Sequence, residues 1–512
     1  MSELRKKYES MASPSKEIKF GGIVGIGRLS RSMRGDSGAA VMVLQTSDVD
    51  NVKNEDSQAT PTIRARTLSL RGLQGASDAD RDFRFAIESD RAGPQSTSRL
   101  SLRRFQRTLH HMSLPPALLM DIQGSFWRRY VPKILLSLAC IIIYCEVVIY
   151  YLVLLQCTWP LLDSATQEHN IRSDPNAAPL KVMMVADTHL LGPFRGHWFD
   201  KLRREWQMKR TFATAMTLHQ PEVVVFLGDL FDEGQWMDNV QFNRDVQRFK
   251  RIFPQAEKTK FIVAAGNHDV GFHYKMTKVL VDRFQRLFSE SDSGVELITV
   301  KGSAFVSLNS IALEGDHCAI CTEAEKELNR IEQIFNCSRT VHERRPVDRS
   351  CEALMAQLPH YTRPILLQHF PLYRANDRGC QDRDGGPNSD GNRERWEVLS
   401  KDMTARLLKL NPRAVFDGHS HHSCSIEHNG PQGPVPEWTL PSFNWRNKNN
   451  PAFVLSVFTP SNFAVSQCRM PQESTVMASY CVCLLALCIW LAVRRCRRNR
   501  YQGFIKLPMQ RS

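Results

Sequence analysis

Two long apolar runs near the ends of the chain restrict its fold more than any other feature of the sequence. They cover Ile134–Leu155 and Val476–Val493, and each approaches the roughly 20 residues with which an α-helix crosses a bilayer. Aromatic and basic residues at 126–130 precede the first run, and five arginines follow the second between 494 and 500. Core helices of a soluble domain do not normally carry such flanks, so the sequence predicts two transmembrane helices.

The positive flanks also predict how the chain is oriented. Both flanks lie toward the chain ends, so the positive-inside rule places both termini in the cytosol and residues 157–475 in the lumen or outside. The net charge of +14 is concentrated in the tails and beside the apolar runs. Those charges cannot steer a nucleic acid to a site in the middle segment, so no nucleic-acid partner is expected. Glu146 in the first run either faces a partner helix or is tolerated in protonated form.

Composition and charge divide the chain into six segments. These are a disordered cytosolic tail at 1–112, a basic and aromatic juxtamembrane segment at 113–133, a transmembrane helix at 134–156, a lumenal domain at 157–475, a second transmembrane helix at 476–493 and a cytosolic tail at 494–512. The N-terminal tail is rich in Ser, Arg, Asp and Gly. It therefore cannot bury enough apolar surface to offset its chain entropy.

Cysteines in the middle segment indicate an oxidising compartment. Of 14 cysteines, eight lie between the apolar runs. Cys318 and Cys321 could form half of a zinc site, but no second pair at a suitable spacing follows, so disulfides are favoured and their pairing stays open. Asn336-Cys337-Ser338 is a glycosylation sequon, which agrees with a lumenal location and a glycoprotein.

Short β-rich apolar runs in the middle segment predict an α/β fold. The predicted strands are Val182–Ala186, Val223–Leu227, Phe261–Ala265, Ala304–Leu308, Ile365–Leu367, Ala414–Phe416 and Phe453–Val457. Helical patterns at Trp198–Leu218 and Val240–Ile252 separate the first three strands. Strands that alternate with helices are typical of α/β architectures.

Five of these strands end in residues that bind metals. The endings are Asp187-Thr188-His189, Gly228-Asp229, Gly266-Asn267-His268-Asp269, Gln368-His369 and Asp417-Gly418-His419-Ser420-His421. In open α/β sheets, functional groups collect at the carboxyl ends of the strands. Carboxylate, imidazole and amide oxygen suit divalent metals, and one Asp can bridge two of them. The glycines before Asp229, Asn267 and His419 are expected to let the backbone turn tightly.

These motifs resemble those of the calcineurin-like metallophosphoesterase superfamily over roughly the middle three-fifths of the chain. The resemblance implies a sandwich of two mixed β-sheets flanked by helices, here held between the two transmembrane helices. It also implies two-metal phosphodiester hydrolysis, in which the metal pair activates a water molecule. Degenerate members of such families usually lose ligands. Every motif is complete here, which favours an enzyme over a non-catalytic membrane scaffold or cargo receptor.

The resemblance assigns a role to each matching residue. One metal would be bound by Asp187, His189 and His421. The second metal would be bound by Asn267, His369 and His419. Asp229 would bridge the two metals, and His268 would act beside the leaving oxygen with Asp269 orienting its ring. His197, His273, His422 and Arg374 are further candidates for the mouth of the site, and the Gly-rich loop Arg383–Asn392 is expected to be a mobile loop over it.

A narrower resemblance concerns the two-span topology and the stretches Ala186–Gly192 and Leu308–Asp316. These are similar to membrane-bound family members that remodel glycosylphosphatidylinositol (GPI) anchors, using Mn²⁺ to remove the ethanolamine-phosphate branch from the second mannose. The resemblance implies GPI-anchored proteins as substrates and cargo receptors as further partners. It also implies that the protein is located in endoplasmic reticulum exit sites, the intermediate compartment or the Golgi. Substrate choice resides in the loops, so another lumenal phosphoester, such as a nucleotide, sphingolipid or phosphoprotein, stays open.

Overall fold

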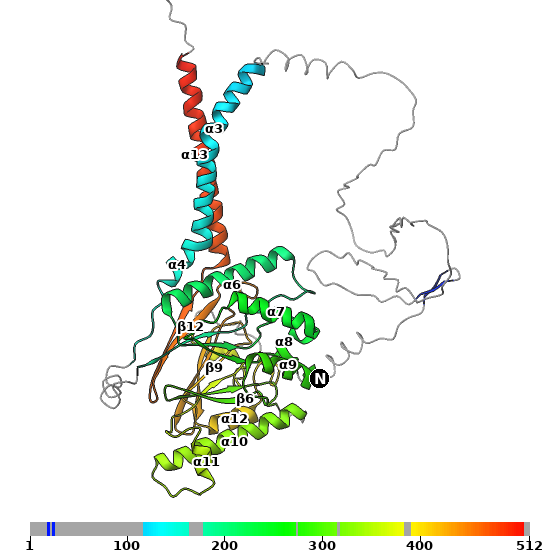
Figure 1. Ribbon diagram of the computed structural model, residues 1–512, viewed down its shortest axis with the longest axis vertical. Helices are drawn as coiled ribbons and strands as arrows, with labels where there is room; N and C mark the ends of the chain where they lie inside the picture. The colour runs from blue at the N-terminus through cyan, green and yellow to red at the C-terminus, as the bar shows by residue number, and fades with distance from the viewer. Residues whose placement is uncertain are drawn as a thin grey trace, which may run out of the picture. The chain divides into compact units, whose positions relative to one another are not determined.

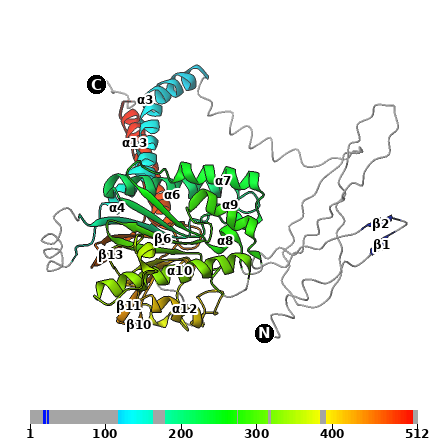
Figure 2. The same ribbon diagram turned by 60° about the horizontal axis from the view of Figure 1, so that its bottom comes forward.

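The computed structural model describes residues 18–20, 23–25, 116–162, 178–272, 275–314, 318–382 and 391–505. Within the unit Met1–Arg99, β1 (Ile18–Phe20) pairs antiparallel with β2 (Ile23–Gly25) (Figure 2). The rest of the predicted disordered tail, His273 and residues 383–390 of the predicted mobile loop lie outside the described residues. The second unit, Leu100–Ser512, contains two larger sheets.

One of its two sheets has five strands in the order β13-β12-β3-β4-β5. The strands are β3 (Leu180–Val185), β4 (Val223–Leu227), β5 (Lys260–Ala264), β12 (Ala452–Phe458) and β13 (Phe463–Arg469). Strands β3, β4 and β5 run parallel, whereas β12 runs antiparallel to both β3 and β13. The carboxyl ends of the three parallel strands therefore lie at one edge of this sheet.

The other sheet has six strands in the order β10-β11-β9-β8-β7-β6. The strands are β6 (Val295–Val300), β7 (Ser303–Leu308), β8 (Ile365–Leu367), β9 (Ala414–Asp417), β10 (Cys424–Gly430) and β11 (Gly433–Thr439). Strands β7, β8, β9 and β11 are parallel, and the hairpin partners β6 and β10 are antiparallel. Both sheets are thus mixed, as expected.

The two sheets face each other across a core that explains their sequences. One buried cluster combines Val182, Met184 and Val225 of the five-stranded sheet with Leu367 and Phe416 of the six-stranded sheet. Alternate residues of the same strands join a second cluster beneath the helices. A strand covered on both faces reads as a continuous apolar run, which is why β4 is buried throughout. The prediction of two mixed sheets flanked by helices is confirmed.

Helices cover the outer faces of the sandwich (Figure 1). They are α6 (Trp198–His219), α7 (Asn239–Ile252), α8 (Asn267–Val270), α9 (Lys278–Phe288), α10 (Ala319–His342), α11 (Cys351–Met355) and α12 (Lys401–Lys409), with short 3₁₀ turns η2 (Gly234–Trp236) and η4 (Asp377–Gly379). Helix α7 shows how capping and packing residues position such a helix. The Asp238 side chain caps its N-terminus by accepting from Gln241 N, and Phe249 packs 5.1 Å from the ring of Phe226 in β4.

Two helical segments extend away from the sandwich, side by side (Figure 1). The first comprises α3 (Pro116–Ile143), a π-helical turn η1 (Tyr144–Val148) and α4 (Ile149–Leu154), and the second is α13 (Glu473–Ile505). The stretches Arg128–Leu154 and Glu473–Arg498 are long and apolar enough to cross a membrane. The hydroxyl of Tyr480 donates to Glu146 Oε1 at 2.6 Å. Of the two alternatives for Glu146, the structure therefore shows a side chain that faces the partner helix.

Disulfides join Cys318 to Cys321, Cys337 to Cys351 and Cys380 to Cys424. Cys318 and Cys321 are thus paired with each other, which favours the disulfide over half of a zinc site. The second disulfide joins the first residue of α11 to the C-terminal part of α10. The third joins the residue after η4 to the first residue of β10. Spacing alone could not supply these pairs, because 8 cysteines allow about 105 connectivities.

Candidate metal centre

Seven side chains predicted as metal ligands converge where the ends of the two sheets meet. Asp187 and His189 follow β3, Asp229 follows β4 and Asn267 follows β5, while His369 follows β8 and both His419 and His421 follow β9. All but His419 and His421 are less than a tenth exposed. The sequence-based expectation that strand ends bring these residues together matches their positions in the structure.

The first group of donor atoms comes from Asp187, His189, Asp229 and His421, whose atoms lie within 4.8 Å of one another. Nε2 of His189 lies 3.0 Å from Nε2 of His421 and 3.9 Å from Oδ1 of Asp187. Nε2 of His421 lies 3.7 Å from the same Asp187 oxygen. The ring nitrogens and carboxylate oxygens therefore point toward one small volume, which is the geometry that a shared cation requires.

The second group consists of Asp229, His369 and His419, with Asn267 beside them. Nε2 of His369 lies 3.1 Å from Oδ1 of Asn267 and 3.3 Å from Nδ1 of His419. Oδ2 of Asp229 lies 3.4 Å from Nε2 of His369 and 3.5 Å from Nε2 of His189. A single carboxylate oxygen thus reaches both groups, which is the position of a bridging ligand.

Backbone carbonyls fix which nitrogen His369 and His419 present to the centre. Nδ1 of His369 lies 2.8 Å from the carbonyl of Leu227, and Nε2 of His419 lies 2.9 Å from the carbonyl of Trp396. Because a carbonyl only accepts, these nitrogens carry the protons and donate. The opposite nitrogens, Nε2 of His369 and Nδ1 of His419, face the centre and are the ones that would offer a lone pair to a metal when each ring is neutral.

Five of the seven residues adopt a left-handed backbone conformation. Their φ angles are 53° for Asp187, 40° for His189, 49° for Asp229, 67° for His419 and 58° for His421. Side chains with a Cβ rarely occupy this region, and it costs about 1–3 kcal/mol per residue outside Gly, Asn and Asp. Such strain concentrates at functional sites because the surrounding fold must hold it in place.

The glycines that precede the ligands serve two different purposes. Gly228 has a φ of +88°, so it provides the tight turn that was expected before Asp229. Gly266 has a φ of −106°, which any residue adopts. A Cβ on Gly266 would lie 2.2 Å from the backbone nitrogen of Asp229 and equally close to its Oδ1. The expected reason is therefore wrong for Gly266, which makes room for the bridging carboxylate rather than for a turn.

Burial keeps three of the imidazoles neutral. It lowers the pKa of His189 and His419 to about 3 and that of His421 to about 2. The physical cause is the loss of hydration, which disfavours the charged ring. A neutral imidazole is the form that donates a lone pair to a metal. These side chains are consequently ready to bind a cation at neutral pH.

The carboxylates make the centre attractive to positive charge. Burial raises the pKa of Asp187 to about 8, and the nearby charge of Asp229 adds to this. Burial disfavours the charged form of His369 too, but Asp229 outweighs it and raises the pKa of that ring to about 9. At neutral pH the charge of Asp229 therefore holds a proton on His369, and burial holds one on Asp187, and a bound cation would displace both protons. Divalent cations fit this donor set, because they would neutralise the acids and use the inward-facing nitrogens and oxygens.

His268 lies beside the first group, but its predicted partner is wrong. Nδ1 of His268 donates to the carbonyl of Asp232 at 2.8 Å and lies 3.5 Å from the Oδ1 of that residue. The carboxylate of Asp269 instead accepts from the backbone nitrogens of Phe231 at 2.9 Å and Gly266 at 3.0 Å. Asp269 thus fixes the loops that follow β4 and β5, and Asp232 rather than Asp269 orients the ring.

Asp232 is a site residue that the sequence reasoning missed. It is fully buried, and its Oδ1 lies 3.3 Å from Nδ1 of His189. With His189 and His268 it forms a third group of closely spaced donor atoms. Arg446 contacts the same carboxylate, and Nη1 of Arg195 lies 3.8 Å from it. Its position three residues after Asp229 was the available signal.

Other candidates for the mouth of the site have different surroundings. The side chain of Arg374 is 4% exposed and pairs with Asp377 at 2.8 Å and Glu437 at 3.4 Å, so it belongs to a buried ion network. His197 caps α6 by accepting from Phe199 N. His422 is half-buried, and its backbone nitrogen donates to Ser420 Oγ at 3.3 Å.

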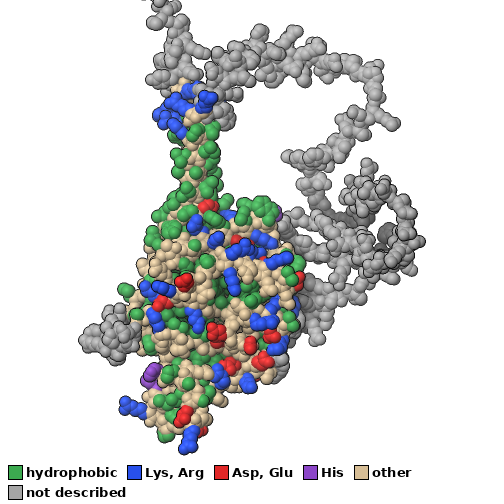
Figure 3. Space-filling view, in the orientation of Figure 1, with side chains coloured by type: hydrophobic (Ala, Val, Ile, Leu, Met, Phe, Trp, Pro, Cys, Tyr) green, Lys and Arg blue, Asp and Glu red, His purple; other side chains and the backbone are tan. Residues whose placement is uncertain are grey.

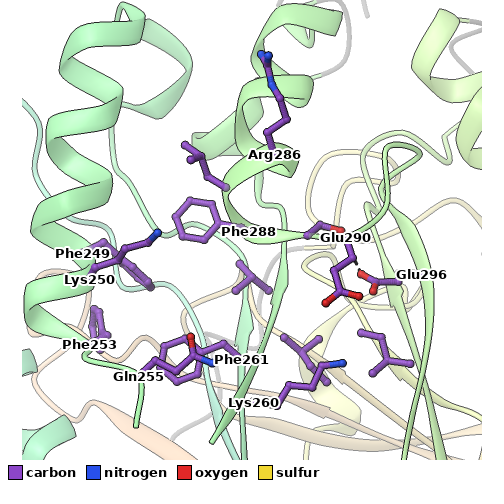
Figure 4. Close-up of a pocket in the computed structure, with 15 residues that line it drawn as sticks. Phe249, Lys250, Phe253, Gln255, Lys260, Phe261, Arg286, Phe288, Glu290 and Glu296 are labelled. Atoms are coloured by element: carbon purple, nitrogen blue, oxygen red, sulfur yellow. Dashed lines mark hydrogen bonds between the residues drawn. The ribbon is translucent and has the colours of Figure 1, made fainter. Parts of the chain in front are cut away.

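A cavity of about 470 Å³ lies elsewhere, between α7, β5, α9 and β6 (Figure 4). Its labelled side chains combine phenylalanines, such as Phe249 and Phe288, with charged residues, such as Lys250 and Glu296. None of the seven predicted ligands is among the described residues that line it. This cavity is therefore separate from the metal centre.

Comparisons with known proteins agree with this geometry. Residues 180–423, which include the whole metal centre, match the calcineurin-like phosphoesterase family. Metallophosphoesterase 1 of Ailuropoda melanoleuca is 45% identical over 357 residues, which are 69% of this chain and 86% of that protein. The Danio rerio protein of the same name is 42% identical over 384 residues, 74% of this chain and 96% of that protein. The Mus musculus protein is 45% identical over 352 residues, 68% and 85% of the two chains.

Proposed function

The chain belongs to the calcineurin-like phosphoesterase family, and from this premise we propose that it removes the ethanolamine-phosphate branch from the second mannose of GPI anchors. Family membership and the donor set make it a metal-dependent phosphoesterase, a hydrolase of phosphoric ester bonds. One observation carries the two-metal proposal. Oδ2 of Asp229 lies within 3.5 Å of ring nitrogens from two separate donor groups.

In this proposal, Asp187, His189 and His421 hold one ion, and Asn267, His369 and His419 hold the other, with Asp229 shared between them. When bound, two such ions supply positive charge that activates the attacking water and stabilises the phosphoryl oxygens. Mn²⁺ is the proposed ion, because the mixed oxygen and imidazole donors suit it and the resembling enzymes use it. Divalent cations as a class are supported by the fold and the donor set.

His268 is the proposed proton donor for the leaving sugar oxygen. Its Nδ1 proton is committed to the carbonyl of Asp232, so Nε2 is the nitrogen that can hold and release a proton. The ring is partly exposed and stacks edge-on against His189 with centroids 4.8 Å apart. It therefore adjoins the first donor group while it stays open to a substrate.

Two arginines give the site its outer positive charge. Arg195 and Arg446 both approach the buried carboxylate of Asp232. Burial lowers the pKa of Arg446 to about 10, so its guanidinium is still charged at neutral pH. An arginine can bind phosphate oxygens in a two-pronged arrangement. We assign these arginines to attraction of the phosphodiester group of the branch, with Asp232 holding Arg446 in place.

The two apolar helices support a membrane location, and the proposal adds the compartment and the orientation. With both termini in the cytosol, the metal centre faces the lumen of the early secretory pathway, where GPI-anchored proteins pass. Attachment of enzyme and substrate to one membrane raises their effective concentration. Remodelled anchors would then be recognised by cargo receptors for transport from the endoplasmic reticulum to the Golgi.

The deciding experiment measures release of ethanolamine phosphate from purified GPI anchors by the full-length protein in detergent, across a Mn²⁺ titration. We expect metal-dependent release that disappears in Asp229→Asn. If no ethanolamine phosphate is released while a simple diester such as bis(p-nitrophenyl) phosphate is hydrolysed, the anchor proposal fails. A lumenal phosphoesterase with another substrate would then be the correct assignment.

His268→Ala separates catalysis from a scaffold role. General acid catalysis contributes about 10²- to 10⁴-fold, so kcat on GPI anchors should fall within that range. Hydrolysis of p-nitrophenyl esters should fall less, because their leaving group needs no proton. Full rescue of GPI-anchored protein transport by this variant in cells that lack the enzyme would contradict the catalytic proposal.

A further inference from the structure

Five large apolar side chains are exposed at the start of α6 and in the loop before it. They are Phe194, Trp198, Phe199, Leu202 and Trp206, with exposed fractions from 42% to 70%. We call this set the α6 ridge. Figure 3 shows hydrophobic side chains on the surface where Figure 1 draws α6, close to the base of the paired helices. Apolar patches of this kind mark interaction surfaces in folded proteins.

The ridge is not a part of the core that has been left open. The opposite face of α6 supplies the core, where Met208, Phe212 and Ala215 are buried. On the outer face, residues 198, 202 and 206 recur every four positions and form one stripe along the helix. Basic side chains border the stripe, and the guanidinium of Arg210 lies 5.4 Å from the ring of Trp206.

The ridge is continuous with the surface of the two apolar helices. Helix α4, the end of the first, contacts α6, and Figure 1 shows α6 crosswise at the base of the pair. Nη1 of Arg203 on α6 lies 2.7 Å from Oε1 of Glu473, the first residue of α13. The long apolar stretch of α13 begins at Val476, one helical turn later. Residues of α6 near Arg203 therefore lie at the level where the bilayer begins.

We propose that the α6 ridge inserts into the interfacial layer of the same bilayer that the two helices cross, so that its partner is a lipid surface. The inference rests on the proposed two-span topology. Trp and Phe side chains are favoured at this depth, and the flanking Lys and Arg side chains extend toward phosphate groups. A hollow of about 270 Å³ beside the ridge is lined by apolar side chains, by Glu205, which pairs with Arg248 at 3.2 Å, and by Lys209 and Arg251. The basic side chains outnumber the acid, which suits the phosphate of a lipid headgroup.

The ridge is also tied directly to the metal centre. Backbone nitrogens of Phe194 and Arg195 donate to the buried carboxylate of Glu233 at 2.8 Å and 2.6 Å. Glu233 follows Asp232, the residue that orients His268. The guanidinium of Arg195 lies 4.5 Å from the ring of Trp236 in the same turn. Insertion of the ridge would therefore set the height of the metal centre above the bilayer and present it to a lipid-anchored phosphodiester.

The test maps lipid contacts on the full-length protein in nanodiscs that contain a phosphatidylcholine with a photoactivatable group near the headgroup. After irradiation, adducts are located by peptide mass spectrometry. We expect adducts on residues 194–206 in addition to those on α13. Leu202→Gln/Trp206→Gln should lower the α6 adduct yield about ten-fold, because two apolar side chains no longer favour insertion. The yield on α13 should not change.

The matched control is Val341→Gln/Val347→Gln, which alters two exposed valines at the end of α10 and beyond it, on the side of the domain away from α13 in Figure 1. It should leave the α6 yield unchanged. Adducts on α13 without adducts on α6 would overturn the inference, as would ridge residues that cross-link to a second copy of the chain. The readout does not require catalysis, so failure of the GPI-anchor proposal would be recognised separately, by the release assay.

An independent observation concerns Cys157 and Cys468. Of the eight cysteines between the apolar runs, the three disulfides use six, and these two are left. Helix α4 contacts β13, and Cys157 packs against the core cluster that contains buried Cys468. We propose that these two thiols form a disulfide that ties the base of the first apolar helix to β13. Each thiol loses a proton, and their two electrons reduce the disulfide of a lumenal thiol oxidoreductase to a dithiol.

Peptide mass spectrometry tests this proposal on the full-length protein from a eukaryotic membrane fraction. The protein is denatured with N-ethylmaleimide present and no reductant. Peptides that contain Cys157 and Cys468 should be recovered linked, and Cys468→Ser should leave Cys157 alkylated. Alkylation of both thiols in the unchanged protein, or linkage of either to another cysteine, would overturn the proposal.

Discussion

The two sheets bring different chemistry to the metal centre. The ends of β3, β4 and β5 supply Asp187, Asp229 and Asn267, together with one imidazole. The ends of β8 and β9 supply imidazoles only, from His369, His419 and His421. One sheet thus provides the carboxylates and the other provides imidazoles alone. Because each donor group draws on both sheets, neither sheet can hold a metal alone, and the centre depends on their packing.

Removal of the shared carboxylate should have the largest effect. Asp229→Asn keeps the shape of the side chain but removes the charge that both groups share. We expect metal binding at both positions to weaken. The value of kcat should fall by more than the roughly 10- to 100-fold that loss of a hydrogen-bond partner of a metal ligand costs. Metal analysis after gel filtration and a diester assay would measure this. Glu222→Gln, at the opposite end of β4, is the control and should stay active.

Removal of an imidazole from the six-stranded sheet should affect one group more than the other. His369→Gln alters the second donor group, whereas the first keeps Asp187, His189, Asp229 and His421. We expect the metal content to fall from about two to about one ion per chain, with weak residual activity restored in part by excess Mn²⁺. Loss of both ions in this variant would contradict the assignment of separate groups.

Removal of the charge of Asp232, which contacts His189 but is not a proposed metal ligand, should have a smaller effect. Asp232→Asn weakens the hold on His189 and Arg446 but leaves every proposed ligand in place. We expect a loss of metal affinity or of kcat/KM of about 10- to 100-fold, as is usual when a hydrogen-bond partner of a metal ligand is changed. Isothermal titration with Mn²⁺ would measure the metal affinity, and steady-state kinetics would measure kcat/KM. An unchanged affinity with an unchanged kcat/KM would remove Asp232 from the site.

The smallest effect concerns stability in the six-stranded sheet. Burial opposes ionisation of Glu437, but hydrogen bonding to His428 and the charge of Arg374 lower the pKa of this carboxyl overall. A pKa below the unfolded value means that stability is present above the unfolded pKa and is lost as pH falls through the folded pKa. Glu437→Gln should lower the unfolding free energy at pH 7 by about 1–3 kcal/mol and flatten its decline in acid. Urea unfolding at several pH values tests this, with exposed Glu427→Gln as control.

Much of the fold and the ligand set could be predicted because the signals are local. An apolar run followed at once by Asp or His identifies a buried strand and its functional end within one short stretch. The seven predicted strands match β3, β4, β5, β7, β8, β9 and β12 to within two residues. The two predicted helices match α6 and α7 equally well.

The structural features that could not be predicted depend on contacts between segments that are distant in sequence. Strand β13 and the hairpin β10–β11 carry partly exposed side chains, so they do not appear as continuous apolar runs. The orientation of His268 could not be predicted, because Asp269 follows it directly in sequence, whereas Asp232 lies 36 residues earlier and reaches the ring only through the folded turn after β4. Disulfide pairs likewise follow from the folded positions of α10, α11, η4 and β10.

The left-handed backbone at five of the seven ligands limits how this centre can be altered or transplanted. A designer who copied the side chains onto strand ends of ordinary geometry would place their donor atoms on diverging vectors. The same constraint applies to natural drift. Replacement of Asp229 by Glu preserves the charge, yet it puts a longer side chain on a backbone with a φ of 49°. The information that specifies this site therefore lies as much in the path of the main chain as in the identity of its residues.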